Sequence, residues 1–229
     1  MDKVERQGLF IVLAGHFNPA IFNPDWIARR GVLEIEDAMV NIDVITPEYA
    51  SFSVSDFKFE VTDERFVLNV LNEPFVKGGD IVAKIFGDVL PETPLSGLGI
   101  NYLVHFRVDS WRQQRALGRL LAPIQHWEEW GMKLESDDLP HIGGLASISV
   151  EEKTEGDDWK GHFRVEVEPS RKLAPGLGVY VQTNDHYQIT DSKSDRNLAT
   201  LCAEQITESI SRSRRIVNKL IAQAMEFEA

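Results

Sequence analysis

The sequence predicts an α+β fold in which antiparallel β-meanders are each followed by an amphipathic helix, with a long helix at the C-terminus. Apolar and polar residues alternate over residues 52–61 and again over residues 163–167, which is the period of half-buried strands. Apolar residues then recur at three- and four-residue steps over residues 81–89 and 198–224, which is the period of helices packed on one side. Both meanders therefore end in a helix.

The first predicted strand covers residues 9–15, an apolar run that follows a charged leader. The alternating segment 52–61 bends at Ser55 and forms two strands, and residues 66–71 return as the next arm of a hairpin. Asp80 is expected to cap the helix that follows, and Pro91 ends it because proline lacks the amide that a helix interior requires.

Residues 98–108 are rich in β-branched and aromatic residues and are long enough to cross a sheet, so we expect a central strand there. Asp109 or Ser110 caps a second helix, which Pro123 stops. The segment 123–130 restarts one helical turn. The sequence therefore predicts a helical segment between the two meanders.

The second meander is predicted from a hairpin over residues 146–150 and 163–167 and a further strand over residues 179–183. The final helix opens at Ser194 or Asp195 and is the longest element expected. Its acidic residues precede its basic ones, which matches the sign of the helix dipole.

The chain is expected to form a single compact body over residues 1–229. A faint internal echo pairs Phe57-Lys-Phe-Glu-Val61 with Phe163-Arg-Val-Glu-Val167. It suggests two similar sub-halves, 1–122 and 142–229, joined by residues 123–141. Short strand similarities also arise from composition alone. The alternative is therefore a single body without two similar halves.

Composition limits the classes of function. The formal charge of −12 disfavours a polyphosphate partner, because such binding is driven by Lys and Arg displacing counter-ions. One cysteine, Cys202, excludes an intramolecular disulfide framework and fits a reducing compartment. The first apolar run is too short to span a bilayer. We expect an acidic, cytoplasmic protein without a membrane segment.

No motif predicts catalysis. The sequence has no Gly-x-x-x-x-Gly-Lys-Ser/Thr loop, and its 6 histidines show no spacing that would converge on a metal. Cys202 falls on the apolar stripe of the last helix, where a thiol stays protonated. His186 follows Asp185 directly, so within one strand the two would point to opposite faces. We therefore predict no catalytic residue, no metal ligand and no cofactor.

Two aromatic segments are candidate partner-binding sites. In the first, two Asn-Pro steps frame Phe22 and are followed by Trp26, a rigid aromatic loop suited to docking. The alternative is that both rings plug the end of the protein's own sheet, because large aromatics fill cores first. In the second segment, Trp127 and Trp130 stand three residues apart beside Pro123. Core or intersubunit packing is the alternative to a base-stacking platform there.

A basic strip is the third candidate. Arg212, Arg215 and Lys219 follow three- and four-residue steps, so they share a face of the last helix. Such a strip fits phosphate or an acidic partner. Pairing within the helix is the alternative, because Glu208 and Arg212 are already four residues apart.

The opening Gly-His-Phe-Asn-Pro-Ala-Ile-Phe-Asn-Pro-Asp-Trp at residues 15–26 and the segment Pro91-Glu-Thr-Pro-Leu-Ser-Gly-Leu-Gly-Ile-Asn-Tyr102 resemble a family of uncharacterised bacterial proteins of about this length. The resemblance implies a bacterial source and no particular activity. From the residues we expect a non-enzymatic interaction or assembly subunit that binds itself, as a homo-oligomer, or another protein. A nucleic-acid accessory protein is the alternative, and an enzyme of unfamiliar type is less well supported.

Overall fold

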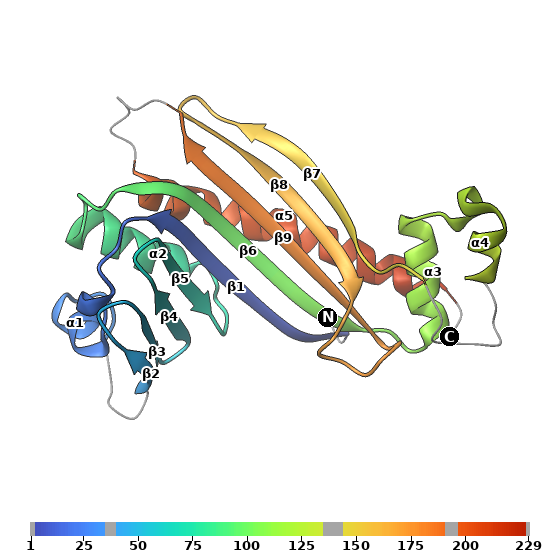
Figure 1. Ribbon diagram of the computed structural model, residues 1–229, viewed down its shortest axis with the longest axis horizontal. Coiled ribbons are helices and arrows are strands. Elements are labelled where there is room, and N and C mark those ends of the chain that lie inside the picture. The colour runs from blue at the N-terminus through green and yellow to red at the C-terminus, as the bar shows by residue number, and fades with distance from the viewer. Residues whose placement is uncertain (1–2, 35–39, 135–143, 191–196, 228–229) are drawn as a thin grey trace.

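The computed structural model describes residues 3–34, 40–134, 144–190 and 197–227. It confirms the predicted α+β class, because a nine-stranded antiparallel sheet carries helices on one of its faces (Figure 1). Among the described residues, no helix has the length and apolar character needed to cross a bilayer.

The sheet has two long strands at its centre and shorter meanders on either side. The central strands are β1 (Val4–Gly15) and β6 (Leu95–Arg107), and the strand order is β2-β3-β4-β5-β1-β6-β9-β8-β7. The outer strands are β2 (Val40–Ile45), β3 (Ala50–Val54), β4 (Phe57–Val61), β5 (Arg65–Val70), β7 (Ile148–Glu155), β8 (Trp159–Pro169) and β9 (Gly178–Ile189).

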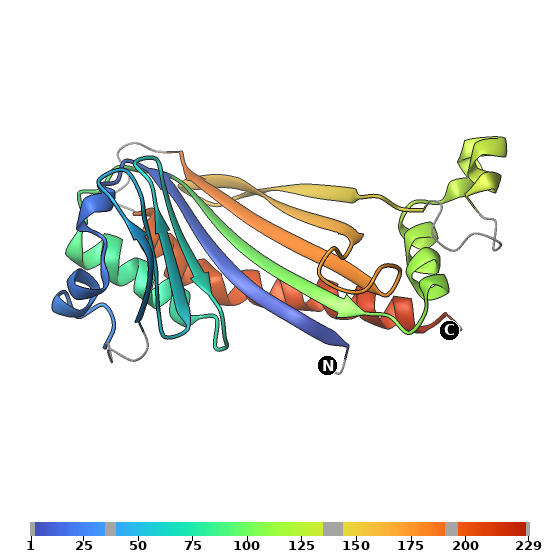
Figure 2. The same ribbon diagram turned by 60° about the horizontal axis from the view of Figure 1, so that its bottom comes forward.

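The helices lie between and after the meanders, and the longest follows the last strand. They are η1 (Pro19–Ile21), α1 (Pro24–Arg29), α2 (Lys77–Ala83), a π-helical segment η3 (Lys84–Val89), α3 (Trp111–Leu121), η4 (Ile124–Trp127), α4 (Glu128–Lys133) and α5 (Leu198–Met225). Figure 2 shows α5 running along one face of the sheet.

The core lies between the sheet and these helices. Alternate residues of β1, such as Leu9, Ile11 and Leu13, are fully buried toward the helices, as the period of two predicts. From α5, a stripe that includes Leu201 and Val217 is buried against the sheet. The opposite face of the sheet carries mainly polar side chains, which is the usual arrangement of an antiparallel sheet with one solvated face.

Two structural repeats make up the sheet. Strands β1 and β3 to β5 followed by α2 have the same arrangement as strands β6 to β9 followed by α5, with β1 and β6 side by side, and β2 is an additional edge strand of the first repeat. Phe57 on β4 lies opposite Val70 on β5, which lies opposite Leu9 on β1. Within the sheet, β1 is therefore the strand of the first repeat that borders the second repeat.

The second repeat follows the same path. Phe163 on β8 lies opposite Asp185 on β9, which lies opposite Ile100 on β6. The two strand segments that echo one another in the sequence therefore occupy equivalent places. However, the arrangement divides the chain before β6, so the predicted sub-half 1–122 contains β6 and α3, which belong to the second repeat.

Several element boundaries differ from those predicted. Asp80 lies inside α2, which begins at Lys77, so it does not cap that helix. The last strand continues from Gly178 to Ile189, well beyond residue 183. The predicted caps Ser194 and Asp195 lie outside the described residues, and the side chain of Asn197 accepts a hydrogen bond from the Ala199 amide at the start of α5 (2.7 Å).

Candidate interaction surface

A helical arm formed by α3, η4 and α4 projects from one end of the sheet (Figures 1 and 2). Ser110 caps α3, as predicted, by accepting a hydrogen bond from the Gln113 amide (3.3 Å). The Gln113 side chain in turn donates to the Phe227 carbonyl (2.9 Å), and Gln114 donates to the Gly178 carbonyl (2.5 Å). These bonds fix α3 against the end of α5 and the start of β9.

The outer part of the arm turns back on itself. At Gly131 a Cβ would lie 2.3 Å from the Ile124 carbonyl oxygen, so only glycine lets α4 approach η4 this closely. Glu128, the first residue of α4, has a positive φ of 50°, which is uncommon for a residue with a side chain. The fold of this segment thus depends on a tight, specific turn.

The turn brings Trp127 and Trp130 together with their rings edge to face, 5.6 Å between centroids. Both side chains stay in water: Trp127 is 56% exposed and Trp130 is 58% exposed. Met132 on the same helix and Leu120 on α3 are also largely exposed. We call Trp127 and Trp130 the arm patch. Concentrated exposed apolar surface of this kind is typical of interaction sites.

The aromatic loop near the N-terminus lies inside the protein. Phe22 is only 1% exposed and contacts Phe66 and Phe86 in the core. Trp26 is half-buried and packs against Phe22, 5.2 Å between ring centroids. This placement matches the alternative in which the loop plugs the protein's own sheet, so it leaves no aromatic docking surface at Phe22.

The basic strip is largely neutralised within the chain. Arg212 bonds the Asp185 carboxylate (Nη2–Oδ2 2.6 Å), and Arg215 bonds Glu208 (2.9 Å). Lys219 is exposed. The structure therefore brings Arg212 into an ion pair with the sheet and not into a surface for phosphate.

The Asp185–Arg212 pair is part of a polar cluster between β9 and α5. Asp185 is 1% exposed, and the Arg212 guanidinium also lies over the Phe163 ring, 3.8 Å from its centroid. Beside it, Thr183 and Ser213 share a hydrogen bond (2.7 Å) in the buried layer. Local sequence patterns gave no signal for this cluster, because its members come from two distant segments.

Two histidines stack on the polar face of the sheet. His162 and His186 are cross-strand neighbours with ring centroids 4.9 Å apart. Burial lowers the pKa of His186, and the nearby charges of His162 and Arg164 lower it further. His186 and Asp185 lie on opposite faces of β9, as expected for adjacent strand residues.

We expect replacement of His186 by Gln to reduce the loss of stability in acid. The unfolded chain takes up a proton at this histidine more readily than the folded protein does, because the folded pKa is depressed. Stability is therefore lost as the pH falls below about 6.5 and is unaffected above it. Urea denaturation of both proteins on either side of that pH tests this, and equal losses in the two proteins would contradict it.

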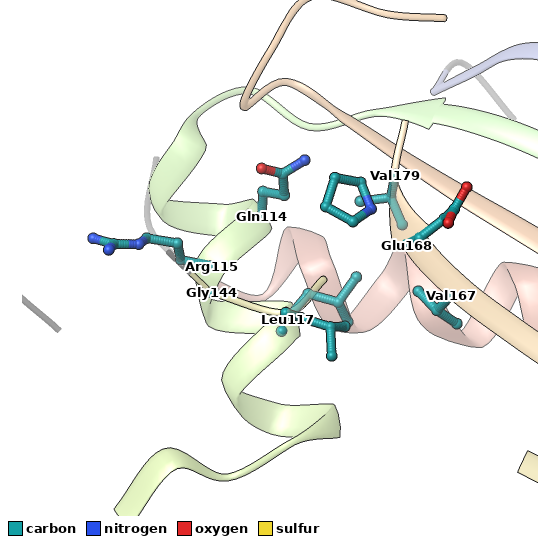
Figure 3. A pocket seen from close by; sticks show the side chains of 10 residues that line it. Gln114, Arg115, Leu117, Gly144, Val167, Glu168 and Val179 are labelled. Carbon is teal, nitrogen blue, oxygen red and sulfur yellow. The ribbon is translucent and has the colours of Figure 1, made fainter. Parts of the chain in front are cut away.

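The structure also offers a small cavity between α3 and the ends of β8 and β9 (Figure 3). Leu117, Val167 and Val179 form its apolar floor. The Arg115 guanidinium and the Glu168 carboxylate extend away from each other at its rim. Its volume is about 70 Å³, far below that of pockets that hold small molecules.

A shallow hollow of about 320 Å³ lies on the polar face across β5, β1, β6 and β9. Its side-chain amides bond one another: the Asn101 oxygen accepts hydrogen bonds from Asn184 (2.6 Å) and Gln182 (3.5 Å), while the Asn101 amide donates to the Phe10 carbonyl (3.4 Å). These amides form hydrogen bonds with one another and with the backbone. The hollow therefore gives no indication of a particular ligand.

Chemistry-bearing side chains do not converge within the described ranges. No group of three or more His, Cys, Asp or Glu side chains gathers there in a way that would hold a metal ion. Cys202 is buried in the core, where burial raises the pKa of its thiol. The arm patch is thus the strongest candidate site.

Comparison with known proteins adds no assignment: no protein-family model matches the chain, and no curated protein is similar to it.

Proposed function

We propose that this protein is a non-enzymatic interaction or assembly subunit that binds another protein chain through the arm patch. The observation that carries the proposal is the pair of exposed, mutually packed rings of Trp127 and Trp130 on a projecting arm. Exposure of these rings to water is unfavourable. A partner that covered them would bury a large aromatic surface, which lowers the free energy of the complex.

The chemistry of the arm patch supports a protein partner. Tryptophan is enriched in the cores of protein interfaces and supplies a large share of the residues that dominate binding energy. Both signs of charge stand on the arm, with Glu128 and Glu129 at the start of α4 and Arg112, Arg119 and Lys133 on α3 and α4.

The other predicted surfaces offer less. A nucleic-acid partner on the basic strip gains no support, because the charge of Arg212 is already offset by Asp185 and that of Arg215 by Glu208. The apolar stripe of α5 is covered by the sheet. A partner that used α5 would have to displace the protein's own core.

We expect Trp127→Ala/Trp130→Ala to weaken binding of the partner by about tenfold or more, because truncated aromatic hot spots have effects of this size. The test is affinity purification from the source cells followed by reconstitution with the purified partner and titration calorimetry. Folding should be unchanged, since substitutions at exposed positions usually alter the free energy of unfolding by less than about 0.5 kcal/mol.

Val150→Ala is the matched control. Val150 is 64% exposed and lies on the edge strand β7, outside the arm patch, so it removes an exposed apolar side chain without touching the arm. A reconstituted complex that tolerates the double tryptophan variant as well as Val150→Ala would refute the proposal.

A further inference from the structure

A serine and a histidine form a hydrogen-bonded pair at the base of the arm. The Ser170 Oγ atom lies 2.8 Å from the Nδ1 atom of His105 on β6, and it accepts hydrogen bonds from the amides of Lys172 (3.1 Å) and Leu173 (3.2 Å). A hydroxyl oxygen has two lone pairs and one proton. Because the two amides use both lone pairs, the hydroxyl donates its proton to Nδ1. His105 is therefore neutral, with its ring proton on Nε2.

The pair stands at the start of the loop that joins β8 to β9, residues 170–177, at the end of the sheet that carries the arm (Figure 1). The Ser170 amide donates a hydrogen bond to the Gly178 carbonyl (3.0 Å), which brings the two ends of the loop together. The same carbonyl accepts the bond from the Gln114 side chain on α3. The closed loop therefore forms part of the attachment of the arm.

We propose that the His105–Ser170 pair is a pH-sensitive switch, in which protonation of His105 opens the 170–177 loop and weakens the attachment of the arm. A protonated imidazole carries a hydrogen on both ring nitrogens. Nδ1 can then bond the Ser170 oxygen only by displacing one of the two amides, and the hydroxyl proton loses its acceptor. The charged histidine and the closed loop therefore exclude one another, so acid shifts the population toward the open loop.

Two positive charges disfavour a proton on His105 while the loop is closed. Burial lowers the pKa of this histidine, and the charges of Arg6, which lies opposite it on β1, and of Lys172 lower it further. The ordinary pKa of histidine is about 6.5, so the ring is neutral at neutral pH and takes up its proton only in acid. Opening of the loop moves Lys172 away from the charged ring, which favours the open form.

The other charged groups on this face have a smaller effect on the histidine. Tyr180 of β9 stacks on the His105 ring, 4.7 Å between centroids, and burial raises its pKa to about 12, so it stays uncharged. Glu168 lies opposite Tyr180, one strand further from the histidine. Arg107, two residues after His105, pairs with Glu5 (2.9 Å). The two nearby cations therefore dominate the electrostatic field at the ring.

Amide hydrogen exchange of the unmodified protein at about pH 7.5 and about pH 5 tests the switch, with rates corrected for the intrinsic effect of pH. We expect the protection of the Lys172 and Leu173 amides to fall by about tenfold at the lower pH, the size of effect that follows the loss of one hydrogen bond. The side-chain amide signals of Gln114 should shift with them. The midpoint of both changes should coincide with the titration of the His105 ring, and the amides of β1 and β6 should stay protected.

Three variants separate the switch from a general effect of acid. His105→Phe keeps a ring on Tyr180 and removes the titrating nitrogen, so exchange of the two loop amides should no longer depend on pH. Ser170→Ala removes the acceptor of both amides, which should then lack protection at either pH. His186→Gln is the matched control, because it removes another histidine of lowered pKa and should leave the response of the loop unchanged.

Any of three results would overturn the inference. The first is equal protection of the loop amides at the two pH values in the unmodified protein. The second is the same acid response in a folded His105→Phe protein, and the third is a ring-nitrogen spectrum that places the His105 proton on Nδ1 at neutral pH. If His105→Phe does not fold, a mismatch between the midpoint of loop opening and the titration of His105 in the unmodified protein refutes the switch. Every measurement uses the protein alone, so the outcome is independent of the partner proposed for the arm.

Discussion

Replacing Arg212 by Leu should lower the free energy of unfolding by about 3–5 kcal/mol, because it leaves a charged carboxylate buried without its partner. Asp185 is 1% exposed, and the Arg212 guanidinium lies 2.6 Å from its Oδ2 atom. The substitution also removes the contact between the guanidinium and the Phe163 ring. Chemical denaturation monitored by circular dichroism measures the loss.

Arg215→Leu is the control for this experiment. Arg215 lies one turn away on the same helix and pairs with Glu208, but both side chains are about two-thirds exposed (66% and 67%). Exposed pairs contribute little, so we expect a change below about 1 kcal/mol. Adding Asp185→Asn to Arg212→Leu should restore part of the lost stability, because no unpaired charge then stays buried. Equal effects of the two arginine substitutions would contradict the account.

The same residue illustrates what the sequence did not predict. Steps of three and four residues correctly place Arg212 and Arg215 on neighbouring positions of a helix, and the helix is real. Which of the two arginines faces the sheet depends on the rotation of α5 and on the register of β9. Both are tertiary properties, so a partner such as Asp185 has no local signal.

Elements with a strong local period were predicted well. The strand segment at residues 57–61, the central strand β6 and the C-terminal helix all follow from apolar spacing, and Ser110 caps α3 as expected. These features depend on neighbours along the chain, which the sequence displays directly.

Two elements, α1 and β2, were not predicted although the sequence carries local signals for both. The two Asn-Pro steps predict a rigid loop, but Asn23 accepts a hydrogen bond from the Trp26 amide (2.9 Å) and Pro24 occupies the first turn of α1. For β2, apolar Val40 and Ile42 flank polar Asn41, which is the period of a strand.

The repeat shows how a weak signal gains meaning from topology. Five similar residues on two strands carry little weight alone, yet both segments lie two strands from a central strand in equivalent register. The arm has no counterpart of similar length in the first repeat, where η1 and α1 lie between β1 and β2. The arm thus arises from the segment in which the two repeats differ most.

Phe66→Ala should also lower the free energy of unfolding by about 3–5 kcal/mol, the usual cost of removing a large aromatic side chain from a core. Phe66 on β5 is fully buried, and its ring centroid lies 4.9 Å from that of Phe86 and 5.7 Å from that of Phe22. It joins η3 and the loop before α1 to the sheet. The resulting cavity cannot close without moving these segments, because each is held by other buried residues.

This substitution also tests how α1 is held on the sheet. Because Phe22 immediately precedes the residues that cap and begin α1, loss of its contact with Phe66 should loosen α1 while leaving the distant arm in place. Denaturation measures the first effect, and hydrogen exchange of the α1 amides measures the second. A Phe66→Ala protein with the stability and α1 protection of the unmodified chain would show that these rings do not hold α1 on the sheet.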